Sequence, residues 1–152
     1  KTPGGRGKNQ KIAGSGHVCP HGEKSAGVLI YIVTDREVRR QLSEASPYAK
    51  PAFAAPLVIV PAADKNRMTS PKYFEQDLAA ATENILLEAE ELGLGAVWMG
   101  IAPLEERMRK VSGALNLPEN ILPFALIAVG YPGEIKKAED RYEESRVHYN
   151  RY

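Results

Sequence analysis

The sequence predicts an α+β domain in which helices cover a central sheet. Two features of the chain favour this fold class. Short apolar runs with the composition of buried strands alternate with segments whose apolar residues recur every three or four positions, as on one helix face. One such segment, residues 70–92, is apolar around most of its circumference, which predicts a central helix buried on more than one side.

The first 27 residues differ from the rest of the chain. Glycines and basic residues dominate them, and almost no apolar side chain is available for burial. Such a composition cannot offset the conformational entropy that is lost on ordering. We therefore expect residues 1–27 to form a poorly ordered segment and residues 28–152 to form the domain.

The domain is expected to begin with a strand, a helix and a second strand. Val28–Thr34 is a continuous apolar run of the kind found in buried strands. Asp35 suits the N-cap of a helix that continues to about Glu44, because its carboxylate can accept hydrogen bonds from N–H groups of the first turn. Leu57–Ala62 is the second buried run.

The central helix is expected to begin at Ser70, an N-cap residue, followed by Pro71, whose missing N–H is not needed in a first turn. Gly93 favours the end of this helix, because glycine adopts the left-handed conformation without a Cβ clash. Ala96–Ile101 follows as a short apolar strand. Gly100 near its end would let a flat molecule approach the backbone.

The C-terminal third is expected to add a helix, a strand and an arm. Pro103 opens a helix with apolar residues on one face, and Pro123–Val129 is a third buried run. Residues 135–144 are charged and expected to be exposed. Arg146–Tyr152 alternates large and polar residues, as an extended arm would.

Composition excludes several classes of protein. The net charge of +1 gives no reason to expect a polyanionic partner such as nucleic acid. The single cysteine excludes an intramolecular disulfide framework and fits a reducing compartment. No apolar run approaches the roughly 20 residues of a membrane span, and no signal peptide is expected. These features predict a cytoplasmic protein without a membrane partner.

The segment from residue 70 to residue 101 resembles the central helix and following strand of the FMN-dependent nitroreductase family. The matching features are, in chain order, Asp77-Leu78, Asn84, Gly93-Leu94-Gly95 and Val97-Trp98-Met99-Gly100-Ile101. The resemblance continues through Leu117-Pro118, residues 125–132 and the tail, so it covers roughly residues 29–152. It implies a homodimeric α/β sandwich with a central mixed sheet, whose N-terminal helices are missing here.

The resemblance also implies a function and a site. Members use FMN and NADH or NADPH to reduce nitro compounds or other small electron acceptors. Trp98, Met99 and Gly100 would lie against the flavin ring. Arg141, with Lys137 as a weaker second residue, would bind the FMN phosphate, which a guanidinium can hold in bidentate fashion. No side chain is expected to act as an acid–base catalyst, because the flavin performs the redox chemistry.

The chain departs from the family at its start. The Arg-rich phosphate-binding motif and a later flavin-binding segment of family members have no counterpart in residues 1–27. One hypothesis is a reading-frame disturbance, because the codons possible for His17–Ala26, shifted by one nucleotide, can encode a segment close to the missing one. The first alternative function is therefore a truncated, non-catalytic nitroreductase-like fold with weak or no flavin binding.

A second alternative is a small metal- or nucleic-acid-binding module that uses the basic N-terminal segment. His17, Cys19 and His21 are residue types that bind zinc, but only three such ligands lie close together in the sequence, so no metal site is expected. The basic segment also lacks aromatic residues on which bases could stack.

Overall fold

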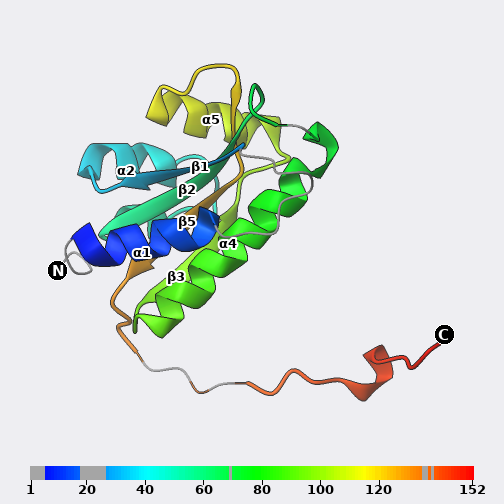
Figure 1. The fold of residues 1–152 in the computed structure, drawn as a ribbon. Coiled ribbons are helices and arrows are strands. Elements are labelled where there is room, and N and C mark those ends of the chain that lie inside the picture. Colours follow the sequence, from blue (N-terminus) through cyan, green and yellow to red (C-terminus); the bar gives the residue numbers. More distant parts are fainter. Residues whose placement is uncertain (1–5, 18–26, 69, 135–136, 138) are drawn as a thin grey trace.

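The structure is a computed structural model that describes residues 6–17, 27–68, 70–134, 137 and 139–152 (Figure 1). Its elements are, in chain order, α1 (Arg6–His17), β1 (Val28–Val33), α2 (Arg36–Ser43), α3 (Pro51–Ala54), β2 (Leu57–Asp64), the 3₁₀ turn η2 (Pro71–Tyr73), α4 (Phe74–Glu91), β3 (Gly95–Gly100), α5 (Glu105–Leu115), β4 (Ile121–Pro123), β5 (Ala125–Gly130) and the 3₁₀ turn η3 (Glu144–Arg146).

The strands form one sheet in the order β1-β2-β5-β3, with the short β4 paired to β2. The predicted α+β sandwich is confirmed, but the expected mixed sheet is not found among the described residues, where every pairing is antiparallel. The reason is the position of β5. It lies between β2 and β3, so these two strands, which α4 connects, run parallel without being neighbours.

Helices cover both faces of the sheet (Figure 1). On one face, α2, α3 and α5 pack over alternate residues of β2 and β5, among them Val58, Val60 and Leu126. On the other face, α1 and α4 pack over the residues between, such as Ile59 and Ile127. Because successive strand side chains point to opposite faces, one apolar run can supply both core layers.

The central helix α4 buries the face that its sequence predicts. Leu78, Ala81, Ile85 and Ala89 are completely buried, whereas Leu87 on the outer side is 61% exposed. The α-helix begins at Phe74 and not at Ser70, because the 3₁₀ turn η2 occupies the first positions.

Two helix boundaries that the sequence predicted are also found in the structure. Gly93, just after α4, has a φ of 69°, the left-handed conformation expected of its stop. The Asp35 carboxylate accepts a hydrogen bond from Val38 N at 2.9 Å and caps α2 as expected.

The sequence predicted no helix before residue 28, and α1 is a difference from that prediction. Ile12 is completely buried in the core beneath α4. Gly16 lets the helix come close, because a Cβ there would lie 2.9 Å from Ile85 Cδ1 and 3.0 Å from Ile30 Cδ1. Lys8 Nζ also donates to Leu92 O at 3.3 Å, so one buried apolar side chain, one close approach and one polar contact hold α1 against the domain. The remaining residues of the predicted poorly ordered segment, 1–5 and 18–26, lie outside the described ranges.

The C-terminal tail has no core of its own. Every described residue from Tyr131 to Tyr152 is exposed, and the tail extends away from the sandwich (Figure 1). No helix in the described part of the chain is both long and apolar enough to cross a bilayer.

Candidate functional site

The end of β3 is an open stretch of backbone. Gly100 is exposed, and a Cβ built on it would have no other atom within 4 Å. The chain just beyond it is held in place, because Ile101 N and Ala102 N both donate to Phe124 O, at 3.2 and 2.9 Å. A rigid backbone edge with free space beside it can accept a flat ligand such as a flavin ring.

Trp98 and Met99 have different surroundings, because neighbouring strand side chains point to opposite faces. Met99 is 5% exposed and belongs to the core under α2, α3 and α5. Trp98 is 37% exposed, and its ring centroid lies 5.7 Å from that of Phe124. Trp98 shares its face with Gly100, so it can contact a ligand there with its side chain, whereas Met99 can offer only its backbone.

The predicted phosphate-binding residues lie on the exposed tail. The Arg141 side chain is 85% exposed, and its only described ionic partner is Glu139, at 3.0 Å. Lys137 is also exposed. The tail leaves the sandwich after β5 and does not return to the end of β3 (Figure 1). One chain therefore supplies a place for the ring but does not bring the basic residues to it.

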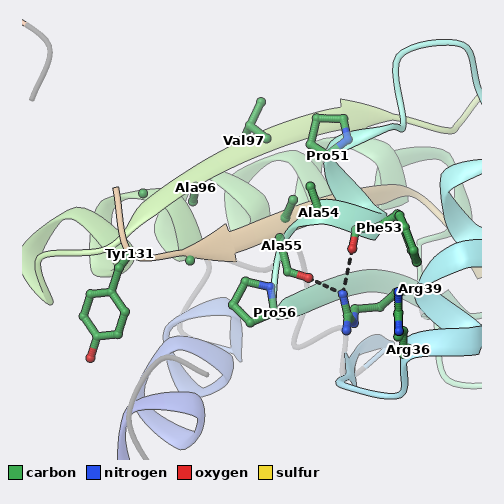
Figure 2. Close-up of a pocket in the computed structure, with 13 residues that line it drawn as sticks. Arg36, Arg39, Pro51, Phe53, Ala54, Ala55, Pro56, Ala96, Val97 and Tyr131 are labelled. Carbon is green, nitrogen blue, oxygen red and sulfur yellow. Dashed lines mark hydrogen bonds between the residues drawn. The ribbon is translucent and has the colours of Figure 1, made fainter. Parts of the chain in front are cut away.

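A groove of about 1170 Å³ lies beside the opposite, Gly95 end of β3 (Figure 2). The residues that line it include Val97 and Ala128 of the sheet, Arg39 of α2 and Tyr131. Arg39 Nη1 donates to the carbonyl oxygens of Phe53, at 2.9 Å, and of Ala55. These contacts join α2 to the segment before β2, so the geometry gives Arg39 a structural role.

Sequence reasoning missed a cluster at the β3 end. Arg107 Nη1 donates to Gly100 O at 3.0 Å, and the Arg107 guanidinium carbon lies 6.0 Å from the centroid of the Tyr48 ring. Arg107 follows Gly100 by seven residues but Tyr48 is more than fifty residues away, so no local pattern could have indicated the whole cluster.

The shifted carboxylates of the described residues belong to ion pairs within single helices. Hydrogen bonds from Arg40 and then Gln41 lower the pKa of Glu37 to about 2. The hydrogen bond from Lys110 lowers the pKa of Glu106. Both shifts indicate helix stabilisation and not an acid–base catalyst.

No group of three or more His, Cys, Asp or Glu side chains within the described ranges is arranged to hold a metal ion. Two residues of the sequence motif considered for zinc, Cys19 and His21, lie outside those ranges.

Comparison with known proteins gives consistent results. The sequence model described as "Nitroreductase family" matches residues 36–131. Two archaeal relatives, both named as a candidate NADH dehydrogenase/NAD(P)H nitroreductase, are 36% identical. The Archaeoglobus fulgidus protein aligns over 94% of this chain and 84% of its own length. The Methanothermobacter thermautotrophicus protein aligns over 80% of this chain, which spans only 63% of that relative.

Solved structures have the same fold. A candidate NADH oxidase from Clostridium acetobutylicum has a TM-score of 0.95 and 40% identity, with coverage of 100% of this chain and 92% of that protein. An FMN-dependent nitroreductase from Clostridium difficile has a TM-score of 0.90 and 25% identity, with coverage of 99% of this chain and 91% of that protein.

Proposed function

This chain belongs to the nitroreductase family, and on that premise we propose that it is a flavin-dependent NAD(P)H oxidoreductase that binds FMN. The observation that supports this most directly is the bare end of β3, where free space adjoins Gly100 and the exposed face of Trp98. Bound flavin would supply the acceptance and donation of hydride, while the protein binds and orients it.

The complete site would require two copies of the chain. The ring would lie at Gly100 of one copy, and Arg141, assisted by Lys137, would reach the phosphate from the tail of the other. The exposed tail in Figure 1 supports this division, because its residues are available to a neighbour and not packed on their own sandwich. A charge-assisted, bidentate contact from arginine suits a phosphate.

The electron acceptor would be a nitro compound or another small acceptor, and the donor NADH or NADPH. A hydride passed through flavin needs no side chain as acid or base. The cytoplasmic location expected from the single cysteine stays a prediction.

A non-catalytic fold is the second candidate. It is favoured by the sequence of residues 1–27, which lacks the flavin-binding segment that the family resemblance leads us to expect there. The protein would then retain the sandwich and bind FMN weakly or not at all.

Flavin binding distinguishes the candidates. Purified protein is mixed with excess FMN and freed of unbound flavin, and its absorbance and its oxidation of NADH and NADPH with a nitroaromatic acceptor are measured. Retained flavin with acceptor-dependent oxidation supports the enzyme. A folded protein that stays colourless favours the non-catalytic fold, and stoichiometric zinc in elemental analysis would favour the metal-binding module.

A further inference from the structure

Arg107 joins two parts of the molecule at the β3 end. It lies half-buried in the first turn of α5, and its Nη1 donates to Gly100 O at 3.0 Å. The ring of Tyr48, from the loop between α2 and α3, has its centroid 6.0 Å from the guanidinium carbon. One guanidinium therefore fixes the strand end and contacts a separate loop.

No ion pair joins Arg107 to a carboxylate within the described residues. Its hydrogen bond goes to a backbone carbonyl, and its other contact is an aromatic face. The adjacent carboxylate, Glu106, is paired with Lys110 at 2.9 Å, and the charge of Arg107 contributes more weakly to lowering the Glu106 pKa. A fixed positive charge thus lies one hydrogen bond away from the backbone of Gly100.

Tyr48 has few contacts besides this guanidinium. Its side chain is 75% exposed, and its N–H donates to Ser46 Oγ at 3.2 Å, which holds the loop. A cation within about 6 Å of an aromatic face is attracted to it, so the Tyr48 ring restricts the position of the guanidinium. A cavity of about 720 Å³ lined by Ser46, Leu104 and Arg107 lies between the loop and α5.

We propose that Arg107, held by Tyr48, is a positioning residue of the flavin site that fixes the Gly100 carbonyl and places a positive charge beside the cofactor. The inference rests on the proposed function. Reduced flavin is more negative than oxidised flavin, so a fixed cation favours binding of the reduced form. This preference raises the reduction potential of the bound cofactor.

The test compares variants of the full-length protein loaded with FMN. Arg107→Met removes the charge, Arg107→Lys retains it, and Arg109→Met makes the same change at an exposed position of the same helix. The midpoint potential of bound FMN is measured together with the melting temperature of each protein without flavin. We expect Arg107→Met to weaken binding of reduced relative to oxidised FMN about tenfold, or about 30 mV. Arg107→Lys restores most of the potential, and Arg109→Met changes it little.

Tyr48→Leu provides a second route that leaves the charge in place. It should shift the potential in the same direction as Arg107→Met but less, and it also serves if Arg107→Met fails to fold. An unchanged potential in both variants, or a loss of melting temperature alone, overturns the inference while leaving the flavin enzyme intact. Parent protein that binds no FMN defeats the proposed function itself and removes this inference with it.

Discussion

At the residue scale, Gly16 shows how a missing side chain decides packing. Valine at this position would meet the ends of Ile30 and Ile85, and Ile85 is completely buried. Gly16→Val should lower the free energy of unfolding by about 1–3 kcal/mol, the usual cost of overpacking. The measurement is urea unfolding.

The control for this prediction is in the same helix. A Cβ at Gly14 meets nothing within 4 Å, so Gly14→Val should change stability by less than about 0.5 kcal/mol, the difference in helix propensity. Equal effects of the two variants would mean that α1 does not pack on Ile85 as the structure shows.

Gly100 gives the opposite prediction, because space beside it is free. Gly100→Val should fold normally, since its side chain meets no atom of its own chain, but it should prevent FMN binding by filling the place of a flat ring. Flavin titration and thermal melting are measured together. A variant that melts far below the parent would make Gly100 a packing residue.

Arg141 lies on the exposed tail, so its removal should not affect the fold. Arg141→Ala should weaken FMN binding by about 1.5–3 kcal/mol if the guanidinium binds the phosphate. Arg151→Ala, another tail arginine, is the control. An unchanged dissociation constant for FMN would remove Arg141 from the site.

At the element scale, the sequence predicted those helices and strands that are specified by residues close together in the chain. The cap at Asp35, the stop at Gly93 and the apolar face of α4 each depend on residues that are close together in the sequence. The helices α1 and α3 and the strand β4 were missed, because each is short or polar and depends on packing against distant segments.

The same distinction applies to the site. Gly100 was noticed because glycine at a strand end is a local feature. Arg107 was not, because its two contacts, with Gly100 and Tyr48, exist only after β3, α5 and the α2–α3 loop have come together. The phosphate site that we propose between two copies rests on the family resemblance and not on a local pattern.

The short helix α2 should respond to acid. Arg40 lowers the pKa of Glu37 from 4.5 to about 2, so this pair stabilises the folded state above pH 4.5 and the contribution disappears as the pH falls toward 2. Glu37→Gln should therefore lower the urea midpoint slightly at neutral pH and not at the acid end. The effect is small because water screens both exposed side chains.

The matched variant for the acid response is Arg40→Met, which removes the largest cause of the shift and leaves the weaker hydrogen bond from Gln41. In that background the pH-dependent part of the Glu37→Gln effect should be smaller. An equally large pH dependence without Arg40 would assign it to another group.

At the scale of the whole molecule, apolar side chains are exposed on two separate parts. Leu87 on α4 is 61% exposed, and on the tail Tyr149 is 75% and Tyr152 completely exposed. One chain has no further element to cover them within the described residues. A symmetric copy could cover both parts at once, because in a two-fold interface every contact between the two chains occurs twice, once for each copy.

We therefore predict an obligate homodimer that buries well over roughly 2,000 Å² of surface. Deleting residues 146–152 removes the aromatic side chains of the arm, so it should raise the dimer dissociation constant and lower the melting temperature. Substituting both Arg146 and Arg151 with alanine retains those aromatic rings and should have the smaller effect. Sedimentation equilibrium across micromolar concentrations measures the association. A compact monomer, with or without FMN, would contradict the prediction and leave Arg141 without a second sandwich whose β3 end it could reach.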